Sequence, residues 1–142
     1  MKVDLDTLRA FFASAPFMAD LGIEPTGGGD GRIDSALLLQ PRHYQHTGQV
    51  HAGVMVTMAD HSMGAAAQTL APEGFVVITA ELSTRLLRAA RGERLLCEAR
   101  VVKPGRQISF TEADVFVEAD GRRVHVVRAS ATMALVARDR LG

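Results

Sequence analysis

Asp60 and His61 are an acid and a histidine in the middle of a segment, residues 45–70, that is otherwise mostly small and apolar. Taking a lone carboxylate out of water is costly unless the group is paired or its pKa shifts. A carboxylate that is kept in such a place can serve as a general base or as a nucleophile. Either the pair lies at a wet surface, or this segment borders a pocket in which the acid is needed.

A helix over about residues 52–70 would place the polar residues of this segment on one side. At roughly 3.6 residues per turn, five polar or small residues fall within about 100° of arc; they are Thr57, Asp60, His61, Gly64 and Gln68. Mostly apolar residues lie opposite, namely Met55, Ala59, Met63, Ala66 and Leu70. The pattern predicts a polar stripe that faces either a pocket or a second subunit.

Histidines near the acid suggest a metal site as an alternative; they are His43, His46, His51 and His61. His43 and His46 lie three residues apart in a loop, whereas two ligands on one helix face stand four residues apart. We therefore expect no metal.

Several flanking elements must position this segment. The pattern predicts a short amphipathic helix over about residues 4–15, capped by Asp4 or Asp6 and stopped by Pro16. A flexible glycine-rich turn at 27–31 and a strand starting at residue 32 should precede the long helix, which Pro72 and Gly74 end.

Four strands should follow the long helix as an antiparallel meander. An Asp-Gly pair within 119–123 is typical of a two-residue hairpin. Between 109 and 118 the chain alternates, with Ser109, Thr111, Ala113, Val115 and Val117 on one face. Four such strands cannot cover both faces alone, and the long helix is the element apolar enough to fill the concave side. We expect an α+β fold, an antiparallel sheet wrapped around one long central helix, as a single domain over residues 1–142.

The composition excludes several classes of function. Sixteen basic residues balance sixteen acidic ones, so no overall field attracts nucleic acid or an anionic membrane. Cys97 is the only cysteine, which excludes an intramolecular disulfide. The first twenty residues do not read as a signal peptide, and charged and polar residues interrupt the most apolar window, 50–67. A cytoplasmic protein is expected.

This order of elements and the sequence QHTGQVHAGVMVTMAD resemble the hotdog fold and, within it, the PaaI-like acyl-CoA thioesterases. Their signature is an Asn or Gln, then six residues on a His-Gly-Gly at the start of the central helix, then an acid nine residues after that His. Gln45, His51 and Asp60 fall at these spacings. Thr79 stands where the family has a Thr or Ser across from the acid. The resemblance covers roughly residues 15–136.

The resemblance implies hydrolysis of an acyl-CoA or aryl-CoA to the free acid and CoA, with no cofactor beyond the CoA of the substrate. It gives Asp60 the role of general base or nucleophile and the backbone N–H of Ala52 that of polarising the carbonyl. Gln45 would hold the thioester or water, and Thr79 would orient the water. The residues implied to bind substrate are His51, Gly53, Gly64 and Arg106, and His51 should also fix the loop and the helix start. Arg106 is one of four arginines, with Arg85, Arg88 and Arg91, that are candidates for the CoA phosphates.

In this family the site forms between two subunits, with the loop around 45–52 from one and the acid from the other, so a homodimer or homotetramer is implied. Two positions depart from the pattern. Ala52 replaces the first glycine after the His, which would cost on the order of 1 kcal/mol if that position needed a positive φ. Gly64 stands where relatives with an upstream Gln often have Thr, so the acyl group stays open.

Two alternatives remain. A hydratase or dehydratase of the same fold would act on 3-hydroxyacyl or enoyl-CoA thioesters with a catalytic histidine, and His51 with Asp60 could serve. A non-catalytic acyl-CoA binding protein would have Ala52 as the mark of a degraded site. Enoyl absorbance with crotonyl-CoA separates the first alternative from a thioesterase, and thiol release separates the second.

Overall fold

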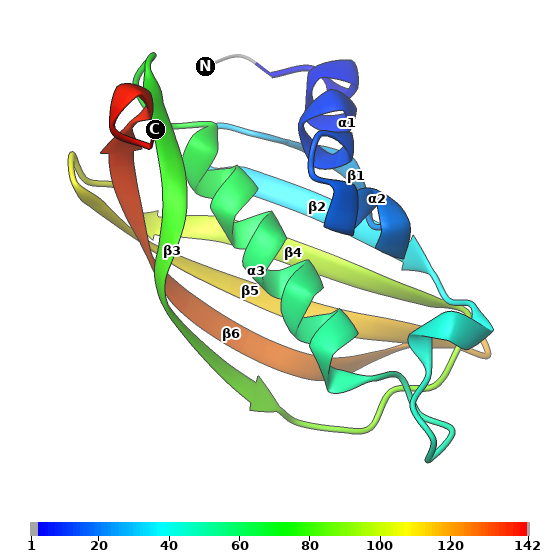
Figure 1. The fold of residues 1–142 in the computed structure, drawn as a ribbon. Helices are drawn as coiled ribbons and strands as arrows, with labels where there is room; N and C mark the ends of the chain where they lie inside the picture. Colours follow the sequence, from blue (N-terminus) through cyan, green and yellow to red (C-terminus); the bar gives the residue numbers. More distant parts are fainter. Residues whose placement is uncertain (1–2, 142) are drawn as a thin grey trace.

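The computed structural model describes residues 3–141, which form three α-helices and six strands (Figure 1). Two short helices come first, α1 (Leu5–Ala13) and α2 (Pro16–Leu21), followed by β1 (Glu24–Gly29), β2 (Arg32–Leu38) and a 3-10 turn (Pro41–His43). The long helix α3 (Ala52–Gln68) follows. The last elements are β3 (Phe75–Leu86), β4 (Arg94–Lys103), β5 (Ile108–Ala119), β6 (Arg122–Ala137) and a 3-10 turn (Arg138–Arg140).

All six strands belong to one antiparallel sheet in the order β1-β2-β4-β5-β6-β3. The sheet curves around α3, which lies in its concave face (Figure 1). This is the expected hotdog architecture, and the fold prediction is confirmed. The hairpin between β5 and β6 turns through Asp120 and Gly121, both with positive φ, as the Asp-Gly pair predicts.

The predicted meander is wrong for β3. β4, β5 and β6 are consecutive neighbours, but β3 pairs with β6 at the edge of the sheet opposite to β1. The reason is the path of α3, which crosses the concave face and leads the chain to the far edge before the next strand begins (Figure 1). The strand that pairs with β2 on this side is therefore β4.

The glycine-rich segment is not a flexible turn as expected. Residues 24–29 form β1, which pairs with β2, and the tight turn is limited to Asp30 and Gly31, both with positive φ. Glycines carry no side chains that could alternate, so the strand left no pattern in the sequence. Pro16 also differs from expectation, because α1 ends at Ala13 and Pro16 opens the second helix, α2. Asp4 caps α1 as predicted.

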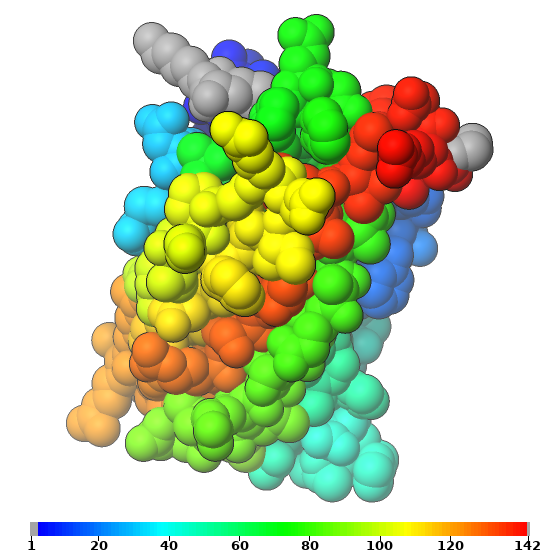
Figure 2. Space-filling model, turned by 90° about the vertical axis from the view of Figure 1, so that its left-hand side faces the viewer, coloured from blue at the N-terminus to red at the C-terminus, as the bar shows by residue number. Residues whose placement is uncertain are grey.

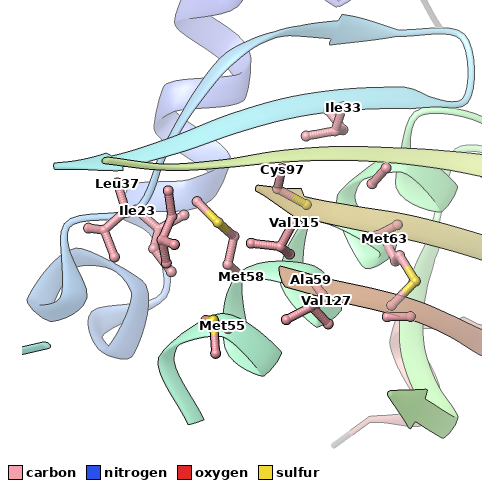
Figure 3. Close-up of a cluster of buried hydrophobic side chains, with 14 of the residues drawn as sticks. Ile23, Ile33, Leu37, Met55, Met58, Ala59, Met63, Cys97, Val115 and Val127 are labelled. Atoms are coloured by element: carbon pink, nitrogen blue, oxygen red, sulfur yellow. The ribbon is translucent and has the colours of Figure 1, made fainter. Parts of the chain in front are cut away.

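The core lies between α3 and the concave face of the sheet (Figure 3). Buried side chains of the helix meet buried side chains from four strands; they are Met55, Met58, Ala59 and Met63 on α3, and Ile33, Cys97, Val115 and Val127 on the sheet. The predicted inward face of β5 is buried throughout. Leu70, expected on the apolar side of the helix, is 40% exposed because α3 ends at Gln68.

Strand β3 is an edge strand with one side unpaired among residues 3–141. None of its residues is buried, and Ile78 is 45% exposed. Figure 2 shows β3, in green, at the surface alongside β6 in orange and red. Within residues 3–141, no helix is long and apolar enough to cross a membrane.

Candidate active site

A single hydrogen bond joins the acid of α3 to the edge strand. The Thr79 hydroxyl donates to Asp60 Oδ1 at 2.7 Å. Thr79 lies on the inward face of β3, opposite the fully buried Met133, whose sulfur is 3.5 Å from the same hydroxyl. Asp60 is half-buried, and its Oδ2 has no hydrogen-bond partner among residues 3–141. The arrangement leaves one carboxylate oxygen fixed and the other available.

The start of α3 is built by His51 and the two residues after it. His51 is the N-cap, and its Nδ1 accepts a hydrogen bond from the Gly53 N–H at 2.8 Å. A side chain at residue 53 would place its Cβ 3.0 Å from this ring nitrogen, so glycine gives the ring room to cap. The Ala52 N–H has no partner among residues 3–141 and lies at the positive end of the helix dipole.

Ala52 occupies its position without backbone strain. Ala52 does not have a positive φ. The conformational cost of placing alanine where a glycine has positive φ therefore does not arise at this position. Alanine also retains the backbone N–H, the group that the resemblance assigns to polarising a substrate carbonyl.

The loop before the helix is pinned at several points. The Gln45 N–H donates to Gln49 O at 2.7 Å, and Arg91 Nε donates to Gly48 O at 2.9 Å. The Gln45 side chain has no hydrogen-bond partner within residues 3–141, so its amide is available to a ligand. A fixed loop that carries a free amide is suited to holding a carbonyl or a water.

The histidines do not gather around a metal site. His43 is buried, with Nδ1 accepting from the Gln40 N–H at 3.0 Å and Nε2 at 2.8 Å from Leu21 O. Both ring nitrogens are thereby used within the chain. In the described part of the chain, no three or more His, Cys, Asp or Glu side chains are grouped so that they could hold a metal ion.

His61 leaves the polar stripe and lies under α1. Its ring packs against Phe11 and edge-on against Phe12, with centroids 5.7 and 4.5 Å away. Its Nε2 is buried without a partner among residues 3–141. Burial lowers the pKa of His61, and the neighbouring charge of Asp60 opposes this shift only in part. His61 is therefore best suited to a neutral, structural role.

Two further stripe residues continue from Asp60. A Cβ at Gly64 would meet nothing within 4 Å, so there is open space one turn beyond the acid. Gln68, one turn further, binds the backbone of β3 with both ends of its amide. The sequence predicts that Gln68 lies on the polar stripe, but it predicts no function for this residue. The only feature of the sequence that could point to Gln68 is its position two helical turns after Asp60.

Arg106 lies in the exposed turn between β4 and β5 and makes no hydrogen bond or ion pair within residues 3–141. Arg106 therefore makes no hydrogen bond or ion pair with Asp60 within one chain.

One chain does not bring all the predicted catalytic groups together. Ala52 and Asp60 lie eight residues apart on α3, which separates them by about 12 Å along the axis at a rise of 1.5 Å per residue. One carbonyl group cannot contact both. Five cavities in the described residues have volumes from about 50 to about 430 Å³, and neither Asp60 nor Thr79 lines any of these five.

Comparison with known proteins identifies the family. A model of the thioesterase superfamily matches residues 47–124, more than half of the chain. This chain belongs to the thioesterase superfamily. The match begins in the loop before α3 and includes Asp60 and Thr79. The family supports thioester hydrolysis as the general class of activity.

Individual relatives agree with this assignment. The structure of a thioesterase family protein from Silicibacter pomeroyi is 32% identical, with a TM-score of 0.88, and the similarity covers 92% of this chain and 96% of that one. A thioesterase of Haemophilus influenzae has a TM-score of 0.86 over 97% of this chain and 94% of that one; at 22% identity it shows the fold alone. A Haemophilus influenzae protein named as a candidate esterase is 27% identical over 71% of this chain and 73% of its own length.

Proposed function

We propose that this protein is a PaaI-like thioesterase that hydrolyses an acyl-CoA or aryl-CoA to the free acid and CoA, at a site shared by two copies of the chain. The observation that carries the proposal is the hydrogen bond from Thr79 to Asp60 Oδ1 on the exposed side of α3, which orients the carboxylate and leaves Oδ2 free. A CoA substrate also fits a cytoplasmic location.

The reaction at Asp60 needs no other base. Oδ2 accepts a proton from a water as the water oxygen attacks the thioester carbonyl carbon. The tetrahedral intermediate collapses, the C–S bond breaks, and Asp60 returns the proton to the thiolate of CoA. In the alternative route Oδ2 attacks the carbonyl carbon, and the C–S bond breaks with release of the CoA thiolate. Water then cleaves the resulting mixed anhydride to the free acid and the Asp60 carboxylate, and a proton from that water neutralises the thiolate. Both routes use the same carboxylate oxygen.

The developing oxyanion requires a donor that the same chain does not supply beside Asp60. The unpaired Ala52 N–H has the right character, because a backbone donor at a helix start needs no reorganisation when charge develops. Its separation of about 12 Å from Asp60 along α3 favours a site in which Ala52 and Gln45 come from one copy and Asp60 and Thr79 from the other.

A two-fold axis satisfies this requirement if the two copies of α3 cross near Val56. Val56 lies midway between residues 52 and 60, so an antiparallel crossing there brings Ala52 of each copy opposite Asp60 of the other. Gly53 is exposed and Val56 and Thr57 are partly exposed, which suits this contact. The unpaired edge of β3 offers a second contact along the same axis. A homodimer is thus the minimal unit, and a homotetramer stays a prediction.

The test is thiol release from a panel of aryl-CoA and fatty acyl-CoA substrates. The parent protein should release thiol, and Asp60→Asn should lower kcat about 100- to 10,000-fold, the range of general base catalysis. Asparagine keeps the shape and can still accept from Thr79, so the fold should be retained. Asp20→Asn is the matched control, since Asp20 is exposed on α2 and pairs with no cation among residues 3–141. Parent-like activity of Asp60→Asn would refute the assignment.

Crotonyl-CoA tests the hydratase alternative. His51 Nδ1 is engaged in capping α3, which favours a structural role over proton transfer. We therefore expect the enoyl absorbance of crotonyl-CoA to persist unless thiol is also released. Hydration of crotonyl-CoA with the thioester intact would instead support the hydratase.

A further inference from the structure

The contact between Thr79 and Asp60 depends on the register of an edge strand. β3 pairs with a neighbouring strand on one side only, so its register is set by its ladder with β6 and by its contacts with α3. A shift by one residue would bring Ile78 or Ala80 to the place of Thr79, and neither side chain has a hydroxyl to donate. A contact that fixes β3 along the axis of α3 therefore bears directly on this hydrogen bond.

A β-bulge aims Thr79 but does not anchor it. Thr79 pairs with Met133 and Glu81 pairs with Thr132, so Ala80 is an extra residue in β3. Bulges turn a side chain to a new direction, often beside an active site. Here the bulge lies directly after the residue that contacts Asp60. Because it also interrupts the ladder with β6, the position of Thr79 needs support from elsewhere.

Gln68 supplies an anchor from α3 itself. Its Nε2 donates to Phe75 O at 3.0 Å, and its Oε1 accepts from the Val77 N–H at 3.1 Å. The side-chain amide thus pairs with β3 as a neighbouring strand would. Both ends of the amide are used, so the bond fixes the position of β3 along the helix.

The two links between α3 and β3 lie on the same side of the helix. Gln68 follows Asp60 by eight residues, and Val77 precedes Thr79 by two. Helix and strand therefore run in opposite directions between a structural link at Gln68 and a functional link at Asp60. Between them, at Gly64, the space beside the helix is open.

We propose that Gln68 is a positioning residue for the thioesterase reaction: by fixing the register of β3 on α3, its amide holds the Thr79 hydroxyl on Asp60. This inference rests on the proposed function of Asp60. Gln68 acts through Thr79, not on the substrate, so its loss should lower kcat while KM changes little.

Gln68→Met is the principal variant, since methionine keeps the length of the side chain and removes both hydrogen bonds. We expect kcat to fall about 10- to 100-fold, as for a misplaced catalytic group, with KM within about twofold. We expect the kcat of Thr79→Val to fall by a similar factor. If Gln68 acts through Thr79, the double variant should be no slower than Thr79→Val alone. Parent-like kcat in Gln68→Met, or losses that multiply in the double variant, would overturn the proposal.

Thr69→Val separates positioning from stability. The Thr69 hydroxyl is buried, donates to Ala66 O and accepts from the Gly31 N–H, and touches neither β3 nor Asp60 through these bonds. Its loss should lower the melting temperature and leave kcat of the folded enzyme near that of the parent. If Thr69→Val lost as much kcat as Gln68→Met, any destabilisation of α3 would be enough to lower kcat. That result would also overturn the proposal.

A crystal structure of Gln68→Met tests the positioning role without relying on an activity assay. We expect the Thr79 hydroxyl to leave Asp60, and an unchanged 2.7 Å contact would refute the positioning role. Absence of thiol release by the parent would refute the proposed function instead. The two failures are thus distinguished.

Discussion

Replacing Ala52 by proline removes one backbone N–H and little else. Ala52 is the first residue of α3, where proline is well tolerated because the N–H has no helical partner. The preceding residue, His51, has φ −61° and ψ 132°, the extended conformation that a residue before proline prefers. The substitution therefore deletes the proposed oxyanion donor without a steric or conformational conflict with the helix start.

The expected effect is large for catalysis and small for stability. Removal of one oxyanion donor lowers kcat about 100- to 1,000-fold. The melting temperature should change little, because no hydrogen bond within the described chain is lost. Ala52→Gly is the matched control, since glycine retains the N–H, and it should keep most of the activity. Full activity in Ala52→Pro would refute the proposed role of this N–H.

The same variant tests whether the site is shared. Heterodimers of an Ala52→Pro chain and an Asp60→Asn chain can be purified through two different tags. If each site takes Ala52 from one copy and Asp60 from the other, one site carries both defects and the second carries none, so about half of the parent activity returns. If both residues acted within one chain, every site would be defective. A heterodimer as inactive as both homodimers would therefore refute the shared site.

Two further predictions follow from buried titratable groups. Because burial lowers the pKa of His61 below its ordinary value of 6.5, the unfolded chain takes up the proton first as pH falls, so stability should decrease from pH 6.5 down to the folded-state pKa. His61→Phe should weaken that decrease, measured by urea unfolding at about pH 7.5 and about pH 5.5, and parallel losses in both proteins would contradict it. Burial raises the pKa of the Cys97 thiol to about 12, so the folded protein should not react with a thiol reagent at about pH 8, whereas urea should expose one reactive thiol. Rapid labelling of the folded protein would contradict this prediction and would also complicate thiol-release assays.

Local patterns in the sequence predicted the parts of the fold that depend on local physics. The apolar periodicity of α3, the alternation in β5 and the Asp-Gly hairpin all reflect residues a few positions apart, and the structure has them as expected. The place of β3 beside β6 depends instead on where α3 ends in space, and no local pattern carries that information. β1 was missed for a different reason, since its Gly27–Gly29 segment has no side chains to alternate.

The same division applies to the candidate site. Spacing along one helix was enough to single out Asp60, and the resemblance supplied Thr79, which the structure brings to 2.7 Å from it. Gln68 could not be found in this way, because its bonds are to the backbone of β3, and backbone partners leave no residue type to recognise.

The substitution at the helix start shows how chemistry and geometry divide between neighbouring residues. At residue 52 the proposed reaction needs a backbone N–H and the helix needs an ordinary φ, and alanine provides both. At residue 53 the constraint comes from the His51 ring, whose capping nitrogen lies 3.0 Å from where a Cβ would be. A His-Ala-Gly sequence therefore meets the requirements of a His-Gly-Gly sequence, whereas exchanging Ala52 and Gly53 would press a methyl group against the cap. Ala52 is thus no mark of a degraded site, which removes the observation that favoured a non-catalytic binding protein.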